Sequence, residues 1–573
     1  MFLVTTAIEE YWKTDKPLLF LGEWCKLYSK KHIWSELNYK VLPYHWDNRE
    51  KFYNDNIYIN SLYEKYLKVL HKQLNIIHNL EYSEKYWRRI IGRWLYSFIG
   101  GVYDRYCMLQ MAGQQKGLTD TYISFSKYPL AQMYPNQINS LLGYDSFNHL
   151  LCSYIIKYIK NIPYTEIVNN DFSFNLKKKN DFSYKNLLKQ KCFKLTPNKF
   201  KNIVFISPYI DPKNIQIALH QLPLSFECED SPLPEVDISE IKRNRLLEPF
   251  QAADEFESLL NRLLKVFTPT IFIEGYKQFS DASLRIFPKS PKVILFGTSQ
   301  DSFNFYSAYY REKGTKTVEI QHGGHYGAGL LNVEEEESIK INDRFFSQGW
   351  DSSESKTIIP LPAIQHYKKR ENFKYNQEGD ILWGMMSVPR YYYLSYSLPV
   401  GPQFQNYIDQ QFQLADLLSD EVFKKILIRF YTHDYGWDEK RRWIEYRKKI
   451  RIDTKYNRLT DALQKSRLFI CTYNATTILE SLYMNIPTVA FWNPEHWELR
   501  ESAKSYYGLL LDSGILHYSP KSAANKINAV FDNPQEWWGG RDIQEARTIF
   551  CQRFARQDSN WVSKWKKEIT SLL

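Results

Sequence analysis

The chain has 573 residues, of which 44% are hydrophobic and 16% aromatic, and its formal net charge is +11. A single core of about 100–200 residues cannot account for this length, and the apolar content excludes a disordered chain. Seven dispersed cysteines without a CxxC pair favour a reducing compartment. The N-terminus lacks the basic segment of a signal peptide, and no uncharged apolar run reaches the roughly 20 residues that span a bilayer. We therefore expect a cytoplasmic protein with two large lobes.

The first half of the chain predicts an alternation of strands and helices. Short apolar runs bounded by Gly, Pro or charged residues are typical of buried strands, and residues 48–111 show the apolar spacing of a helix. The expected strands are 2–7, 17–22, 203–207, 270–273, 293–296 and 317–320, and the expected shorter helices are 252–267 and 303–313. Because strands alternate with helices, we predict a mostly parallel sheet with crossover helices.

A second alternating series begins near residue 343. Its expected strands are 380–385, 426–431, 468–472 and 487–492, and its expected helices are 404–418 and 478–484. The tail from 534 to 573 has a helical pattern and is rich in Trp and Arg. Two such series predict an α/β protein with two lobes.

Polar clusters directly follow several predicted strands. Open parallel sheets bind ligands at the carboxyl ends of their strands, where helix N-termini and free backbone amides gather. The first cluster is Gln321, His322, Gly323 and Gly324. Paired glycines let the backbone approach an anion closely, and Gln and His side chains offer hydrogen bonds. We expect a ligand-binding turn here; a plain glycine turn is the alternative.

A second cluster surrounds the end of the strand predicted at 426–431. It contains Arg429 and His433. Both side chains can neutralise a phosphate, and a histidine can also protonate a departing phosphate oxygen. An exposed surface turn remains the alternative.

The third cluster stands at the start of the helix predicted at 478–484. It contains Asn474, Thr476 and Thr477, and Glu480 follows one turn later. Free N–H groups at a helix start favour negative charge, and a carboxylate can accept hydrogen bonds from ribose hydroxyls. An ordinary helix cap explains one threonine but not the whole cluster.

The fourth cluster is a carboxylate beside a glycine. Glu274 directly follows the strand predicted at 270–273 and precedes Gly275. A carboxylate at a strand end is a candidate nucleophile or base. We predict Glu274 as the carboxylate of the reacting centre, with a helix cap as the alternative role and Glu23 as the competing residue.

Several common site patterns are absent from the sequence. There is no Asp-x-Asp pair, the usual divalent-metal anchor for a nucleotide diphosphate. There is also no GxxxxGK[ST], GxGxxG or HExxH pattern. These absences argue against a P-loop kinase, a nicotinamide enzyme and a zinc peptidase.

Several segments in the same order carry a family resemblance. They are LVTTAIEEYW, LFLGEWC, EIQHGGHYG, HDYGWD, YNATTILESLYMNIPTVAFW and the tail residues FCQRFAR. Over nearly its whole length the chain resembles transferases of bacterial O-antigen and capsule loci, first annotated from Leptospira. That family is similar to retaining transferases of nonulosonic sugars such as pseudaminic acid, which use CMP-activated donors.

The resemblance implies two Rossmann-like lobes of GT-B type. We expect an N-terminal acceptor lobe over 1–335 with a helical insertion, a nucleotide-sugar lobe over 336–535, and a helical tail over 536–573 that crosses back. The implied reaction moves a nonulosonic acid such as pseudaminic acid from a CMP donor to a bacterial surface polysaccharide, with retention. Catalysis would then rest on Glu274, with His322 and Gln321 orienting the sugar.

The resemblance also implies nucleotide contacts. Arg429 to His433 takes the place of a His-Pro motif that holds the cytidylate phosphate, although no proline is present. Thr476 and Thr477 resemble the Ser/Thr motif of those enzymes, whereas their acidic triplet has no clean match. The implied nucleotide-binding residues are Arg429, His433, Asn474, Thr476, Thr477, Glu480, Gly323 and Gly324.

The expected partners follow from this reading. They are a nucleotide-sugar donor and a glycan or lipid-linked glycan acceptor, with no metal or other cofactor. The basic stretch Lys177–Lys201 is either a solvated loop or a peripheral membrane contact. A transferase that uses a UDP-, GDP- or dTDP-sugar remains an alternative. A basic nucleic-acid-binding protein is a second one, although no nucleic-acid reading motif is visible.

Overall fold

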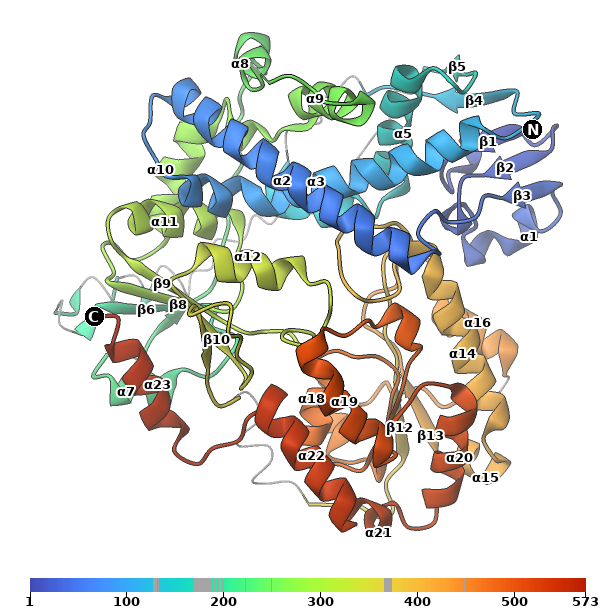
Figure 1. The fold of residues 1–573 in the computed structure, drawn as a ribbon, viewed down its shortest axis with the longest axis vertical. Helices are drawn as coiled ribbons and strands as arrows, with labels where there is room; N and C mark the ends of the chain where they lie inside the picture. Colours follow the sequence, from blue (N-terminus) through green and yellow to red (C-terminus); the bar gives the residue numbers. More distant parts are fainter. Residues whose placement is uncertain are drawn as a thin grey trace.

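The computed structural model forms three parallel β-sheets covered by helices (Figure 1). It describes residues 1–126, 131, 133–168, 188–189, 191–192, 195–197, 200–221, 223–248, 250–364, 374–447 and 449–573. Most of the basic stretch Lys177–Lys201 lies outside these described residues. Within them, no helix combines the length and the apolar character needed to cross a bilayer.

The first sheet is formed by the N-terminal residues and has the order β3-β2-β1-β4-β5. Its strands are β1 (Phe2–Val4), β2 (Leu18–Phe20), β3 (Tyr39–Val41), β4 (Asp120–Ile123) and β5 (Thr165–Glu166). Its helices are α1 (Lys31–Trp34), α2 (Arg49–His78), α3 (Glu84–Gly113), α4 (Ile138–Leu141) and α5 (Asp145–Ile159). The long helical stretch expected near 48–111 is thus a pair of helices inserted between β3 and β4.

Local chemistry sets the ends of these two long helices. The Asn48 side chain accepts a hydrogen bond from the Lys51 N–H and caps α2, and Ser83 caps α3 in the same way. Helix α2 ends at Asn79, which has the left-handed conformation (φ 53°) that stops a helix. The apolar side chains of α2, such as Leu70, repeat every three or four residues and are buried against α3.

The second sheet has the order β11-β10-β9-β8-β6-β7. Its strands are β6 (Ile203–Ile206), β7 (Ser225–Phe226), β8 (Val293–Phe296), β9 (Lys316–Ile320), β10 (Arg344–Ser347) and β11 (Ile358–Pro360). Its helices are α7 (Lys213–Ala218), α10 (Tyr276–Ile286), α11 (Asp301–Glu312) and α12 (Val333–Ile341), whereas α8 (Glu240–Arg245) and α9 (Glu255–Phe267) pack against α2, α3 and α5. We call this part of the chain the second lobe.

The third sheet has the order β13-β12-β14-β15-β16. Its strands are β12 (Ile381–Gly384), β13 (Ile426–Arg429), β14 (Leu468–Cys471), β15 (Thr488–Phe491) and β16 (Leu516–His517). Its helices are α14 (Phe404–Leu417), α15 (Asp420–Lys424), α16 (Glu439–Tyr446), α17 (Leu459–Leu463), α18 (Thr476–Tyr483), α19 (Glu501–Asp512) and α20 (Pro520–Val530). We call this part the third lobe. In both lobes the strand order reverses beside the first strand, and such switch points are where open sheets bind ligands.

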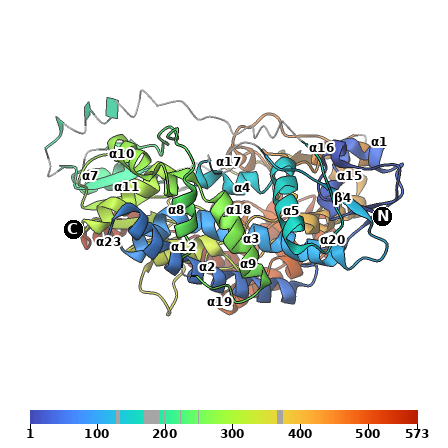
Figure 2. The ribbon, with the colours of Figure 1, turned by 90° about the horizontal axis from the view of Figure 1, so that it is seen from above.

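The C-terminal tail crosses from the third lobe back to the second. It contains α21 (Pro534–Trp538), α22 (Arg541–Phe554) and α23 (Trp561–Thr570). In α22, the Phe550 ring packs edge-on against Tyr507 of α19, with 5.1 Å between centroids. In α23, Trp565 packs against Phe346 of β10 and donates a hydrogen bond to the Pro362 carbonyl at 3.2 Å. The C-terminus therefore lies beside the second sheet, far from the N-terminus (Figure 2).

The predicted α/β fold with two Rossmann-like lobes and a returning helical tail is confirmed by the second and third sheets. The prediction is wrong about the extent of the first lobe and about one strand. The boundary expected near residue 335 would cut the second sheet, because β10 pairs with β9 and β11 pairs with β10. Residues 1–335 also contain the separate first sheet. In addition, the strand expected at 270–273 is a 3₁₀ helix over Thr270–Phe272.

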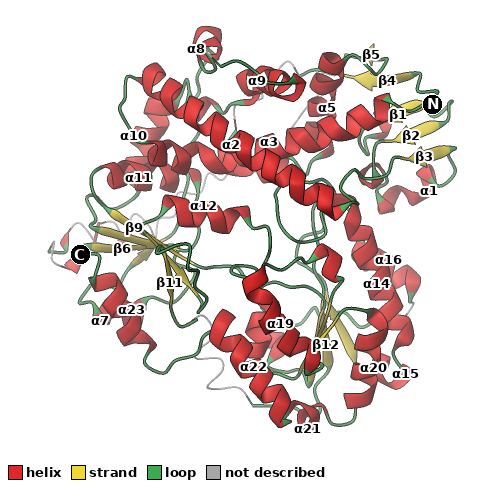
Figure 3. Ribbon diagram, viewed as in Figure 1, coloured by secondary structure: helices red, strands yellow, loops and turns green. Residues whose placement is uncertain are grey.

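The N-terminal part of the chain, through its long helices α2 and α3, contacts both lobes (Figure 3). At the start of α2, the Arg49 guanidinium forms a two-pronged ion pair with Glu498 of the third lobe, at 2.7 and 2.9 Å. Along α3, Arg88 pairs with Glu337 of α12 in the second lobe at 3.0 Å. The pair of long helices therefore spans the two lobes.

Candidate functional site

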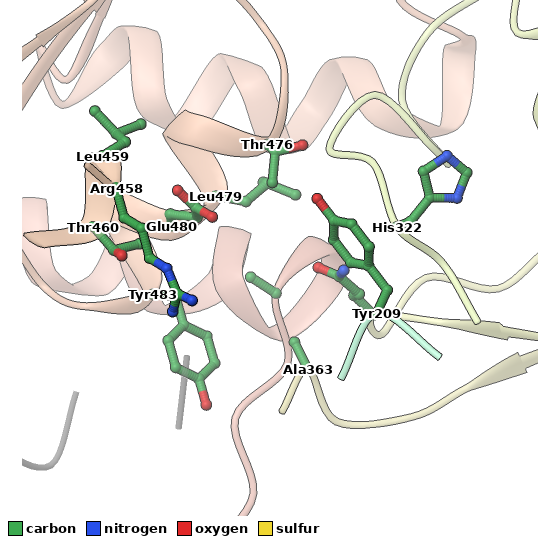
Figure 4. Close-up of a pocket in the computed structure, with 12 residues that line it drawn as sticks. Tyr209, His322, Ala363, Arg458, Leu459, Thr460, Thr476, Leu479, Glu480 and Tyr483 are labelled. Atoms are coloured by element: carbon green, nitrogen blue, oxygen red, sulfur yellow. The ribbon is translucent and has the colours of Figure 1, made fainter. Parts of the chain in front are cut away.

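A cavity of about 380 Å³ lies between the carboxyl edge of the second sheet and helix α18 of the third lobe (Figure 4). Both lobes contribute side chains to the same space, as expected for a ligand held between two Rossmann-like sheets. We call it the first cavity. Its lining residues are Tyr209, His322, Gln348, Ala363, Arg458, Leu459, Thr460, Thr476, Leu479, Glu480, Tyr483 and Ala555.

The predicted turn after β9 reaches this cavity through one side chain. His322 lines it, and its buried Nδ1 has no hydrogen-bond partner in the described structure. Gln321 is fully buried: its Nε2 donates to the Gly323 carbonyl at 2.7 Å, and its Oε1 accepts from Trp350 Nε1 at 2.8 Å. Gln321 therefore shapes the turn, and His322 is the side chain presented to a ligand.

Gly324 brings this turn against the third lobe. A Cβ atom added there would lie 2.2 Å from the Thr476 backbone nitrogen and 2.3 Å from the Ala475 carbonyl carbon. A Cβ at Gly323 would meet only the Tyr326 ring, at 2.8 Å. The absence of a side chain at Gly324 thus permits backbone contact between the two halves of the site.

The cluster at the start of α18 is divided by the structure. Thr476 and Glu480 line the cavity. Ala475, the residue before the helix, supplies no side-chain cap to the first N–H groups of α18, which favour negative charge. Asn474 is buried and accepts a hydrogen bond from Tyr507 at 2.8 Å, and Thr477 bonds to Tyr473 at 2.5 Å. These last two residues hold the loop and do not line the cavity.

Arg429 does not line the cavity either. Its guanidinium pairs with the buried Asp453 and donates to the carbonyls of Tyr456 at 2.8 Å and Asn457 at 3.2 Å. Arg429 therefore stabilises the position of the loop residues that directly precede Arg458. His433 is exposed, stacks edge-on with Tyr435 and does not line the cavity. The direct phosphate contacts predicted for Arg429 and His433 therefore stay a prediction that the lining of the first cavity does not support.

Nine of the twelve lining residues were not predicted from the sequence, and Arg458 and Tyr209 are the two with the clearest chemical use. Arg458 precedes α17 and is the arginine that lines the first cavity. Tyr209 follows β6 and is 55% exposed, with the left-handed backbone (φ 62°) that non-glycine residues seldom adopt. For Tyr209, the sequence signal that could have identified it is an aromatic residue directly after an apolar strand and Pro208. For Arg458, a lone arginine in a polar loop carries no such signal.

Glu274 lies outside this site. It follows the 3₁₀ helix and forms a two-pronged ion pair with Arg243 at 2.8 and 3.0 Å. Its side chain is 4% exposed and lines neither this cavity nor the one described below. The premise of the Glu274 prediction, a strand ending at the ligand edge, is therefore wrong. Glu23, its competitor, pairs with Lys26 beside the first sheet and does not line these cavities.

A second cavity of about 230 Å³ adjoins the first, and His322 lines both. It lies between α3, the ends of β8 and β9, and α12. Its other lining residues are Arg88, Arg89, Arg93, Tyr96, Gly297, Thr298, Ser299, Asn304, Glu319, Tyr326, Val333, Glu334, Glu337, Ser338, Ile341 and Leu394. The second cavity could not be predicted from the sequence, because α3 is brought to the second lobe only by tertiary contacts.

Two carboxylates of the second cavity have opposite pKa shifts. Burial raises the pKa of Glu319, although the Arg89 and His322 charges oppose the rise. Burial acts on Glu334 in the same direction, but Arg93 and His322 hold its pKa below the ordinary value. Arg93 lies 2.5 Å from Glu334. Burial also raises the pKa of Glu337, the third carboxylate of this cavity. The cavity thus holds one carboxylate with a lowered pKa beside two with raised pKa values, a combination suited to acid–base chemistry.

Comparison with known proteins identifies the family. The profile of the LIC12162 family transferases matches residues 1–569, so the chain belongs to this family. A search of curated proteins found no match. Among solved structures, the chain is similar to Staphylococcus aureus MnaA with UDP, at 11% identity over 65% of this chain and 97% of that one, with a TM-score of 0.36. It is similar to Acinetobacter baumannii MurG at 12% identity, over 51% and 78%, with a TM-score of 0.29. It is also similar to Anabaena HepE with UDP and glucose, at 14% identity over 64% and 98%, with a TM-score of 0.33.

Proposed function

We propose that this transferase is a glycosyltransferase that moves a sugar from a nucleotide-activated donor to a bacterial surface glycan. The observation that carries the proposal is the first cavity, which lies between two Rossmann-like sheets. It has His322 on one side and, on the other, the N-terminus of α18, which has no side-chain cap. Membership in a transferase family supports the reaction class. A glycan or lipid-linked glycan is the proposed acceptor.

The first cavity would hold the nucleotide. Arg458 and the first N–H groups of α18 would receive the phosphate, because both favour negative charge. Glu480 would accept hydrogen bonds from ribose hydroxyls, and the exposed ring of Tyr209 offers an apolar face for the base or sugar. This assignment keeps Thr476 and Glu480 from the sequence prediction and replaces Arg429 with Arg458.

The reaction would take place beside His322. The bond between the anomeric carbon and the phosphate oxygen breaks, and the nucleotide leaves with the electron pair. The acceptor hydroxyl then bonds to the sugar and loses its proton to a base. His322 can hydrogen-bond the departing phosphate oxygen or donate a proton to it. Glu334, held ionised by Arg93, replaces Glu274 as the proposed carboxylate that stabilises or attacks the oxocarbenium-like centre.

The finer donor assignment remains part of the proposal. A CMP-activated nonulosonic acid such as pseudaminic acid, transferred with retention, follows from the family resemblance. The absence of an Asp-x-Asp pair supports a monophosphate donor bound without metal, because one phosphate needs less neutralisation than two. A UDP-, GDP- or dTDP-sugar is the alternative.

A thermal-shift panel tests the nucleotide assignment. A ligand that binds the folded state raises its apparent stability by mass action. We expect CMP or CDP to stabilise the protein more than UDP, GDP or ADP, with the same shift in EDTA. Arg458→Ala should weaken CMP binding by about tenfold, because charge-assisted contacts contribute about 1.5–3 kcal/mol.

The matched control is Arg441→Ala, which removes an exposed arginine from α16, outside the first cavity. Its CMP affinity should equal that of the unmodified protein. A clear preference for a diphosphate of another base, or loss of binding in EDTA, would contradict the CMP assignment. Equal affinity in Arg458→Ala and Arg441→Ala would place the phosphate elsewhere.

A further inference from the structure

Helix α3 places three arginines against the second cavity. Arg88, Arg89 and Arg93 all line it. Charged side chains are buried at a cost unless a partner of opposite charge compensates them. The pairing of each guanidinium therefore indicates whether it serves the fold or is available to a ligand.

Two of the three arginines are compensated by the protein. Arg88 forms ion pairs with Glu64, with Glu84 at 3.1 Å and with Glu337 at 3.0 Å. Arg93 pairs with Glu334 at 2.5 Å. These contacts tie α3 to α2 and α12, and they explain both arginines without a ligand.

Arg89 differs from both neighbours. It is 6% exposed, and among the described residues no carboxylate lies within 4.0 Å of its guanidinium nitrogens. Its Nη2 donates to the Asn342 side chain, and its buried Nε has no hydrogen-bond partner there. The guanidinium also lies over the Phe296 ring, 5.0 Å from the centroid. A buried guanidinium that lines the cavity thus has no carboxylate partner among the described residues.

The electrostatics of Arg89 agree with this geometry. Burial lowers the pKa of Arg89 to about 10, and the more distant Glu319 and Asp343 oppose the effect only in part. Glu319 accepts hydrogen bonds from Ser338 at 2.8 Å and Asn342 at 2.7 Å, so its oxygens are directed to those groups. An anion entering the cavity would supply the charge that the protein does not place beside Arg89.

We propose that the second cavity is a subsite for an acidic sugar, whose carboxylate pairs with Arg89. The inference rests on the proposed glycosyltransferase function and assigns the cavity and the arginine that would hold the carboxylate of its substrate. A guanidinium binds a carboxylate through two parallel hydrogen bonds, which a neutral sugar cannot form.

The rest of the cavity suits a hydroxyl-rich ligand. Thr298, Ser299 and Asn304 stand on the side of β8 and α11, and Tyr96 and Leu394 add apolar surface. Such a mixture of apolar wall and a few polar groups is typical of small-molecule sites. Because His322 lines both cavities, a sugar held here would lie next to a nucleotide held in the first cavity.

The carboxylate can belong to the transferred sugar or to the acceptor. One arm of the test compares CMP with CMP-N-acetylneuraminate, which carries a donor-side carboxylate. The other arm adds a glucuronate-containing trisaccharide, or its glucose counterpart, to the CMP-saturated protein. Affinities are measured by calorimetry for the unmodified protein and for Arg89→Met. Free N-acetylneuraminic acid and its methyl ester provide the matched charged and neutral probes.

We expect one acidic probe to bind at least about tenfold more tightly than its neutral counterpart, and Arg89→Met to abolish that difference. CMP alone should bind both proteins equally. The arm that shows the effect identifies the source of the carboxylate. If neither acid exceeds its neutral counterpart, or if Arg89→Met keeps the difference, the subsite proposal is wrong. A failure of CMP itself to bind the unmodified protein would instead overturn the proposed function.

Stability measurements separate binding from folding. Arg89→Met removes a buried cation that has no ion pair, so its Tm should stay equal or rise. Arg88→Met removes the arginine that pairs with Glu64, Glu84 and Glu337, and it should lower the Tm. Arg89→Lys retains the charge without the two-pronged geometry and should recover part of the acid preference. A large fall in Tm for Arg89→Met would assign Arg89 to the fold and overturn the proposal.

Discussion

Gly324→Ala tests whether backbone contact between the two lobes builds the first cavity. The added Cβ would lie 2.2 Å from the Thr476 nitrogen and 2.4 Å from its Cα, whereas real Cβ atoms essentially never come closer than 3.0 Å. All three nearest atoms belong to the backbone, so no side-chain rotation relieves the clash. The turn and α18 must separate by about 1 Å, at a cost of about 1–3 kcal/mol.

This separation should weaken nucleotide binding as well as folding. His322 and Thr476 lie on opposite sides of the contact. A ligand that binds both residues therefore finds the binding-competent conformation of the protein less populated. A free-energy cost near the middle of that range, about 2 kcal/mol, corresponds to about a thirtyfold loss of CMP affinity. Thermal denaturation and CMP titration by calorimetry measure the two effects.

Two other glycines provide controls. Gly508→Ala lies within α19, where an added Cβ meets nothing within 4 Å, and should stabilise the helix by about 0.5–1 kcal/mol. Gly323→Ala meets only the Tyr326 side chain, which can shift, and should have an intermediate effect. If Gly324→Ala matches Gly508→Ala in Tm and CMP affinity, the argument from backbone contact is refuted.

Three further predictions concern charged side chains. Arg429→Ala should destabilise the protein by about 3–5 kcal/mol in urea denaturation, because it leaves the buried Asp453 without its partner; an unchanged midpoint would contradict this. Glu274→Gln should lower the Tm, but the protein that remains folded should keep its turnover rate. Glu334→Gln should keep its CMP affinity and lose turnover by orders of magnitude. The reverse pattern would restore the Glu274 assignment. Burial raises the pKa of Glu439 to about 8, so the folded state keeps a proton that the unfolded state releases near 4.5. The free energy of unfolding should therefore fall as pH rises from about 5 to 8, by up to about 1.4 kcal/mol per unit, and Glu439→Gln should flatten this slope.

The sequence alone was sufficient for several of the central strands of the two lobes. Buried parallel strands are short apolar runs whatever they pair with, so β8, β9 and β14 could be predicted close to their observed bounds. The polar turn after β9 and the start of α18 were predicted as ligand-binding for the same local reason. The error at 270–273 also has a local cause, because a four-residue apolar run fits a strand or a helical turn equally well.

The tertiary structure decided which of the predicted side chains meet a ligand. The sequence does not distinguish Arg429, Arg458 and Arg89. In the structure, Arg429 is paired with Asp453, Arg458 lines the first cavity, and Arg89 has no ion partner among the described residues. The Asn342 side chain that contacts Arg89 is 253 residues away along the chain. Helix periodicity and capping depend on neighbours within a few residues, whereas charge pairing and cavity formation depend on segments that only folding brings together.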